Sequence, residues 1–188
     1  MAILKIAKMG HPVLRRRADE VSDPRAPEIR QLVENMIETM EDADGAGLAA
    51  PQVHVPLRVV IFHVPEGRDE DNPDPVPLSV LINPVVEPLT EEREVDWEGC
   101  LSVPGMMGAV PRFTKVRYRA VSLEGEPIER VAEGFHARVA QHECDHLDGK
   151  LYPQRMEDLS LLMFSDQLCY FGGRDEADED ALDEDLRE

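Results

Sequence analysis

Residues 142 to 146 read His-Glu-x-x-His, a pattern that brings two imidazoles and one carboxylate together. In a helix, His142 and His146 project from the same face, so both rings can reach one metal ion. Glu143 lies about 100° further around the helix, where it can touch a water beside the ion but is badly placed to bind the ion itself. Such a carboxylate can act as a general base beside a Lewis acid. The motif therefore predicts a catalytic metal centre, the alternative being solvated histidines on an exposed helix.

A catalytic metal of this kind needs a third protein ligand, and the chain after the motif offers no good one. No histidine follows His146, and Glu157 follows it by only eleven residues, too close for the usual glutamate of a later helix. Upstream, WEGCLSVPG (97–105) contains Cys100. A thiolate and two imidazoles leave one tetrahedral position open for water. We therefore expect Cys100 to be the third ligand, the alternative being a small buried side chain.

A third segment, GAGLAAPQ (45–52), consists mainly of small residues. Small side chains allow a substrate backbone to approach closely. No Lys-Ser or Lys-Thr pair follows, which excludes a phosphate-binding loop of the Walker type. Alone, this segment indicates a substrate-binding loop only weakly.

Together and in this order, GAGLAAPQ, EGCLS and QHECDHL resemble the three motifs of the peptide deformylase family. The flanking segments GHPVLRRRA, LINP and SVPG agree, and the resemblance covers roughly residues 3 to 165. It implies an enzyme that removes the N-formyl group from the N-terminal formyl-methionine of newly made polypeptides and releases formate. It also implies Fe(2+) in the cell, with Ni(2+), Co(2+) or Zn(2+) possible in purified protein.

The resemblance further implies a role for individual residues. Glu143 would take a proton from a metal-bound water and pass it to the leaving amine. Gln52 and the backbone N–H of Leu101 would donate hydrogen bonds to the developing oxyanion. The metal ligands would be Cys100, His142 and His146, and the substrate would lie against Gly45, Gly47 and Gly99.

Two other interpretations of the chain remain. A zinc endopeptidase would share the His-Glu-x-x-His motif but would take its third ligand downstream. A catalytically silent domain that binds a metal would be expected to lack the base, the oxyanion glutamine or a ligand. Glu143, Gln52 and Cys100 are all present, which favours the deformylase interpretation.

The elements that position these segments can be predicted from hydrophobic periodicity. Apolar residues three and four apart in 27–45 predict an amphipathic helix that begins at Pro27. A second helix is expected from His136 onward, carrying the metal motif. Strands are expected at 57–64, 80–88, 115–125 and 126–134, with a hairpin turn at 124–126 and an exposed loop at 66–77. We therefore predict a single compact α+β domain, with mostly antiparallel strands around a central metal-binding helix and the amphipathic helix near its N-terminus.

Charge and composition limit the partners and the compartment. The 188 residues carry a net charge of −19, which disfavours nucleic-acid binding. Three cysteines suit a reducing compartment, and no apolar run is long enough for a signal peptide or a membrane span. We expect a bacterial cytoplasmic protein that meets formyl-methionyl nascent peptides in transient proximity to the ribosome, without contact with a membrane. Residues 1–171 should form the deformylase domain, and 172–188, with nine acidic and two basic residues, a mobile acidic tail.

Overall fold

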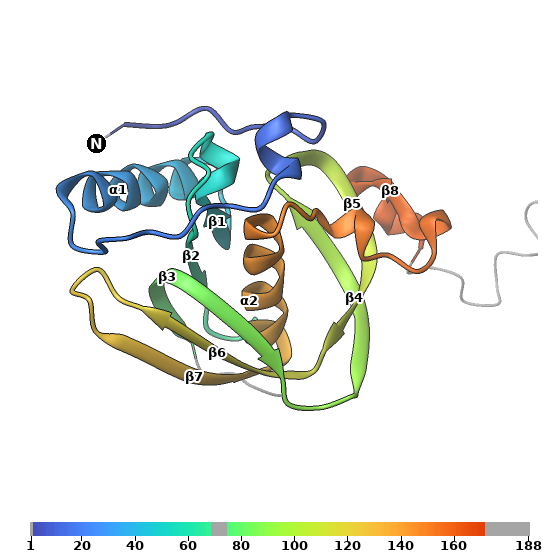
Figure 1. The fold of residues 1–188 in the computed structure, drawn as a ribbon. Coiled ribbons are helices and arrows are strands. Elements are labelled where there is room, and N and C mark those ends of the chain that lie inside the picture. The colour runs from blue at the N-terminus through green and yellow to red at the C-terminus, as the bar shows by residue number, and fades with distance from the viewer. Residues whose placement is uncertain (1, 69–74, 172–188) are drawn as a thin grey trace, which may run out of the picture.

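The protein is described from a computed structural model that covers residues 2–68 and 75–171. A central helix, α2 (Gly134–Leu147), runs between two antiparallel sheets, and a second helix, α1 (Pro27–Asp42), covers the outside of the larger sheet (Figure 1). The larger sheet has the order β1 (Gly47–Ala49), β2 (Val59–Val64), β3 (Val76–Pro88), β6 (Lys115–Val121) and β7 (Pro127–Glu133). The smaller sheet has the order β4 (Arg93–Cys100), β5 (Val103–Phe113) and β8 (Leu162–Phe164). This confirms the predicted α+β class.

Helix α1 forms where the apolar periodicity predicts it. Pro27 occupies the first turn, where its missing N–H costs no hydrogen bond. Ile29, Val33, Met36 and Met40 are buried in one stripe against the larger sheet. The two methionines are therefore core residues.

Strand β2 separates the two main hydrophobic cores. Its side chains alternate between the faces of the sheet, so Val59 and Ile61 pack toward α1, whereas Val60 and Phe62 pack toward α2. Burial on both faces explains the uninterrupted apolar run in this segment. The result is a layered arrangement in which α1, the larger sheet and α2 fix one another in place.

The smaller sheet is the main feature that the sequence did not predict. Cys100 is the last residue of β4, and β5 begins at Val103, where only a stretch rich in glycine and proline was evident. Most residues of β4 are exposed and many are charged, so the strand lacks the apolar pattern of a buried one. Pairing along the full length of β5 holds it in place.

The remaining predictions concern connecting segments. The hairpin turn between β6 and β7 is confirmed: Ser122 N–H donates to the carbonyl of Glu126 at 2.8 Å, and Gly125 has a φ of +85°. Of the predicted loop at 66–77, residues 69–74 lie outside the described residues, and Val76 and Pro77 already belong to β3. The predicted tail, 172–188, also lies outside them. Within the described residues, no helix has the length and apolar character needed to cross a bilayer.

Candidate metal centre

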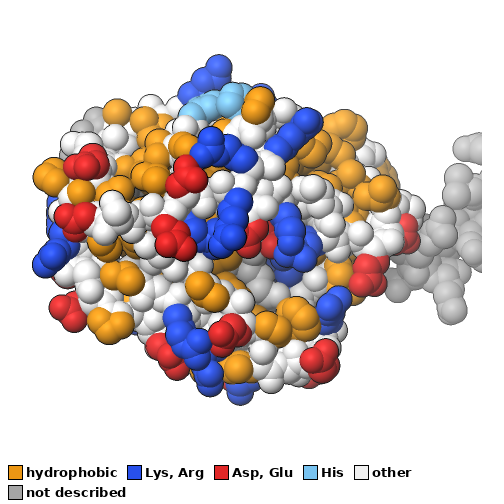
Figure 2. Space-filling view, in the orientation of Figure 1, with side chains coloured by type: hydrophobic (Ala, Val, Ile, Leu, Met, Phe, Trp, Pro, Cys, Tyr) orange, Lys and Arg blue, Asp and Glu red, His pale blue; other side chains and the backbone are white. Residues whose placement is uncertain are grey.

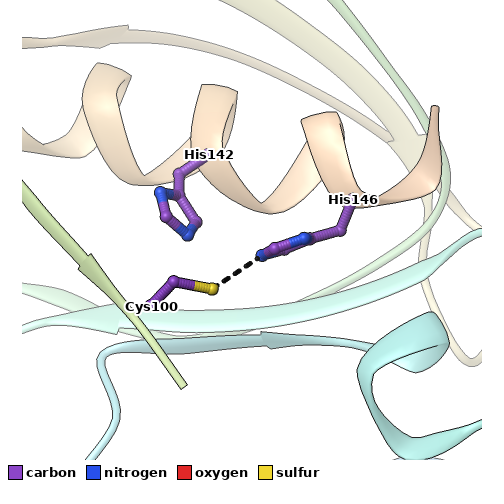
Figure 3. A group of neighbouring side chains, drawn as sticks. All are labelled: Cys100, His142 and His146. Atoms are coloured by element: carbon purple, nitrogen blue, oxygen red, sulfur yellow. Dashed lines mark hydrogen bonds between the residues drawn. The ribbon is translucent and has the colours of Figure 1, made fainter. Parts of the chain in front are cut away.

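Three side chains from two elements converge beside α2. His142 and His146 project from one face of the helix toward Cys100 at the end of β4 (Figure 3). One ligand atom from each lies within 4.8 Å of the others, and Cys100 Sγ is 3.4 Å from His146 Nε2. Ligand atoms around a tetrahedral ion with metal–S and metal–N bonds of about 2.3 and 2.1 Å lie ~3.5 Å apart. The donor set and its spacing therefore fit a divalent metal ion.

The orientation of His142 is fixed by a carboxylate that the sequence reasoning missed. Glu98 Oε2 lies 2.8 Å from His142 Nδ1 and accepts its hydrogen bond. The other ring nitrogen, Nε2, is thereby left free to bind a metal. Glu98 lies in the same EGCLS segment as Cys100, so one strand end supplies both the ligand and the group that orients another ligand.

Glu98 is part of a buried network of charged side chains. Arg112 donates to both of its carboxylate oxygens, at 2.8 and 2.9 Å, and Arg138 donates to Oε1 at 3.0 Å. Arg112 also donates to Asp145 at 2.6 Å. Burial opposes ionisation of Glu98, but the hydrogen bonds from Arg112 and His142 outweigh it and hold the pKa of this carboxyl well below its usual value. Glu98 is therefore a carboxylate held rigidly between two arginines and His142.

Replacing Glu98 with glutamine should destabilise both the fold and the metal site. The change removes the carboxylate nearest to Arg138 and one of the two carboxylates paired with Arg112 in the interior, so we expect the free energy of unfolding to fall by about 3–5 kcal/mol. Metal affinity should fall by about 10- to 100-fold because His142 loses its orienting partner. Urea denaturation and a metal-competition titration measure the two effects.

The matched control for that variant is Glu129→Gln, which removes a carboxylate paired with Arg119 at the surface. Exposed ion pairs are worth less than about 1 kcal/mol, so stability and metal affinity should hardly change. Equal losses in the two variants would show that Glu98 has no special structural role.

Glu143 lies in the interior beside the candidate metal-binding group. It is 5% exposed, and its Oε2 has no hydrogen-bond partner among the described residues. Burial raises the pKa of Glu143 to about 7. A carboxyl group with such a pKa can both accept and return a proton near neutral pH.

Gln52 is held with its amide nitrogen toward Cys100. Its Oε1 accepts from the N–H of Ala49 at 2.8 Å. Its Nε2 lies 3.2 Å from Ser102 Oγ and 3.6 Å from Cys100 Sγ. The short helix of residues 50–53 that follows β1 therefore presents a fixed N–H donor beside the thiol.

A cavity of about 500 Å³ opens onto these groups. It lies between the segment before β1, the turn from β4 to β5, and α2. The predicted site residues that line it are Gly45, Gly47, Gln52, Gly99, Cys100, Leu101, His142 and Glu143. His146, 1% exposed, lies deeper. Apolar side chains complete the wall, including Met106, Met107, Phe135 and Val139. The structure thus brings the predicted residues together around one cavity.

These features define a metallohydrolase whose candidate metal-binding group is two helical histidines and an upstream cysteine, whereas a zinc endopeptidase would take its third ligand downstream. The family model for polypeptide deformylase matches residues 3–161, and the chain belongs to that family. A peptide deformylase of Nitrosomonas europaea is 50% identical over 177 residues, which cover 94% of this chain and 99% of that protein. One from Bordetella pertussis is 51% identical over 163 residues, with 87% and 93% covered.

Solved structures agree with this assignment. The class I type b peptide deformylase of Acinetobacter baumannii, bound to Met-Ala-Ser, superimposes with a TM-score of 0.76 at 37% identity. The match covers 82% of this chain and 98% of that one. The protein is therefore a metal-dependent hydrolase that removes the N-formyl group from nascent peptides, and the silent-domain interpretation is not favoured.

Proposed function

We propose that this chain deformylates the N-terminal formyl-methionine of new polypeptides, with Cys100, His142 and His146 as the metal ligands. The observation that carries the proposal is the meeting of the Cys100 thiol with both histidines of α2, next to the buried Glu143. A bound divalent ion would supply Lewis acidity and lower the pKa of a coordinated water toward ~7.

The protein side chains account for the remaining steps. Glu143 accepts a proton from the attacking water and returns it to the leaving amine, as its buried position and raised pKa allow. Gln52 Nε2 and the backbone N–H of Leu101 donate to the oxyanion that forms on the formyl carbon. By analogy with other acyl-transfer sites, each such donor lowers the barrier by about 3–4 kcal/mol. Formate leaves, and the new amino terminus is free.

The glycines beside the base explain how the substrate can approach so closely. A Cβ built on Gly47 would lie 2.7 Å from Glu143 Cδ, and one on Gly45 would lie 2.9 Å from Leu101 Cδ1. Side chains at either position would therefore intrude on the groups assigned to the chemistry. We assign Gly45, Gly47 and Gly99 to substrate binding, where the absence of a side chain admits the formyl-methionine backbone.

Gly47→Ala should lower kcat/KM by about 100-fold, because the new methyl group displaces the carboxylate of Glu143. A shift of about 1 Å in the position of a catalytic group has an effect of this size. Gly45→Ala is the matched comparison, with a smaller expected loss, because the nearest atom to its methyl group is the end of a flexible leucine side chain, Leu101 Cδ1 at 2.9 Å. The test is to measure kcat/KM of both variants with a formyl-methionyl peptide and to determine their metal content. Equal losses in the two variants would contradict the close fit of Gly47 to Glu143.

We infer that the ion in the cell is Fe(2+), and that Ni(2+), Co(2+) or Zn(2+) can replace it in purified protein. One thiolate and two imidazoles suit all four ions, so the donor set supports the inference without selecting among them. A ferrous ion beside a thiolate is sensitive to oxidation, and protein handled in air should lose activity.

The proposed setting is the bacterial cytoplasm, in transient proximity to ribosomes that supply nascent chains. Direct nucleic-acid binding and membrane contact are not part of the proposal, in keeping with the net charge of −19. We assign the activity to residues 1–171 and propose that the acidic segment 172–188 takes no part in it.

Deleting residues 172–188 should leave kcat/KM for a short formyl-peptide within about twofold of the full chain. The family model for polypeptide deformylase matches residues 3–161, and the predicted site residues end at His146. Steady-state kinetics of the two proteins, loaded with the same metal, test this. A loss of tenfold or more would assign the tail a part in catalysis.

The proposed function is tested by mass spectrometry of formyl-Met-Ala-Ser incubated with the ferrous enzyme in the absence of oxygen. Loss of the formyl group alone is the expected result. Cleavage of an internal peptide bond would instead indicate an endopeptidase, and no reaction with a full complement of metal would indicate a silent domain.

A further inference from the structure

Helix α2 has a second face that the deformylase site does not use. Gln141, Cys144 and Asp145 on this face, together with Asp148 directly after the helix, line a separate cavity of about 760 Å³. The opposite wall comes from β3 and β5, and the rim includes the segment that follows α2. The volume lies within the range of ~300–1,000 Å³ that is usual for small-molecule sites.

This second cavity is positively charged although the protein as a whole is acidic. Its lining has three carboxylates and six basic side chains, a local excess of three positive charges: Asp145, Asp148, Glu157, Arg17, Arg58, Arg93, Arg112, Lys150 and Arg155. The chain carries −19 overall. Figure 2 shows Lys and Arg side chains gathered across the middle of the face on which Figure 1 shows α2 between β3 and β4. The local excess of positive charge therefore lies around the opening of this second cavity.

The carboxylates in the lining are already neutralised by arginines of the same wall. Asp145 pairs with Arg155 at 2.5 Å and with Arg112 at 2.6 Å, Asp148 pairs with Arg58 at 2.8 Å, and Glu157 pairs with Arg93 at 3.9 Å. Lys150 is exposed and forms no ion pair within residues 2–68 and 75–171. Arg17 is exposed and reaches Asp148 only at 3.9 Å. The rim thus holds two cations available to a ligand.

The depth of the cavity strengthens its positive potential. Arg58 and Arg112 are 7% and 5% exposed and lie in its inner wall, which is otherwise largely apolar. A concave site with low-dielectric walls concentrates the field of its charges and attracts ions of the opposite sign. Cations at the rim and in the wall together favour a ligand that carries more than one negative charge.

We propose that this cavity binds a small oxyanion with at least two negative charges, either a phosphate or a dicarboxylate. Lys150 and Arg17 would contact it at the rim, and the paired arginines would form the wall behind it. The ligand would lie on the far side of α2 from the metal, so its binding does not depend on the deformylase reaction. A long nucleic acid is disfavoured because its phosphates would extend onto an acidic surface.

The test is isothermal titration of the full-length, metal-loaded protein at low ionic strength, with inorganic phosphate in one series and succinate in the other. The Lys150→Gln/Arg17→Gln double variant should bind the preferred anion about tenfold more weakly than the wild type. The matched control is Lys5→Gln, which removes one charge from an exposed lysine outside the cavity and should bind like the wild type. Both substituted side chains are exposed, and a thermal unfolding curve confirms that the double variant is folded.

Each result has a defined meaning. Tighter binding of phosphate than of succinate, lost in the double variant, identifies the ligand as a phosphate, and the reverse order identifies a dicarboxylate. Equal affinity in the wild type and the double variant would overturn the proposal, because the anion would then bind elsewhere, such as at the metal. Absence of binding of either anion to the wild type at 20 mM, a concentration of roughly the upper limit for a useful site, would also overturn it.

Discussion

Glu143→Gln should lower kcat by about 10²- to 10⁴-fold while the protein keeps its metal. The amide has the size of the carboxylate but cannot accept the proton of the attacking water. Because Glu143 is 5% exposed and its Oε2 has no partner among the described residues, no network of hydrogen bonds would be broken by the change. The fold should therefore be retained, and stability should stay the same or increase slightly.

Three measurements separate this result from simple damage. Metal content by mass spectrometry should match the wild type, KM should change little, and kcat should fall. Glu124 lies at an exposed turn and does not line the cavity of the candidate site. Glu124→Gln is therefore the control for the loss of one glutamate, and it should be fully active. Substantial retained turnover in Glu143→Gln would assign the role of base to another group.

Cys100→Ser should weaken metal binding by more than about 100-fold and remove activity at ordinary metal concentrations. The thiolate is the metal-binding form of cysteine, whereas a serine hydroxyl remains protonated at neutral pH. The loss of a direct ligand should exceed the 10- to 100-fold effect of losing an orienting partner such as Glu98. The two histidines would remain on α2, so weak binding should persist.

The chain provides its own controls for the cysteine. Cys144 is buried on the other face of α2, and Cys169 is exposed, so neither Cys144→Ala nor Cys169→Ser should change metal affinity. A competition titration with a chromophoric chelator compares the three variants. Wild-type affinity in Cys100→Ser would place the third ligand elsewhere.

Local patterns in the sequence predicted much of the fold because the spacing of apolar residues depends on which side chains are buried. The stripe of Ile29, Val33 and Met36 requires a helix with one buried face, and the run in β2 requires a strand buried on both. The smaller sheet could not be predicted in the same way. Its strand β4 is held by pairing with β5, while its own side chains are mostly exposed and charged.

The candidate site likewise has residues that local sequence patterns predict and residues that they do not. The spacing of His142 and His146 determines which face of a helix they share, the lack of a downstream ligand indicated Cys100, and motif resemblance indicated Gln52. The network of Glu98 with Arg112, Arg138 and Asp145 depends on contacts between residues 14 to 40 positions apart, and no local sequence pattern marks such contacts. One indication of this network was present in the sequence. A charged residue inside a motif segment, such as Glu98 in EGCLS, suggests a buried partner of opposite charge.

Because α2 is enclosed by two sheets and two cavities, insertions in this helix should be tolerated poorly. One extra residue after Glu143 would rotate all later positions by about 100° and raise them by 1.5 Å. His146 would turn away from Cys100, and Asp145 would leave Arg112, so the metal site and the buried charges would be lost together. Homologous enzymes of different length should therefore accommodate their extra residues in the connecting loops and not in this helix.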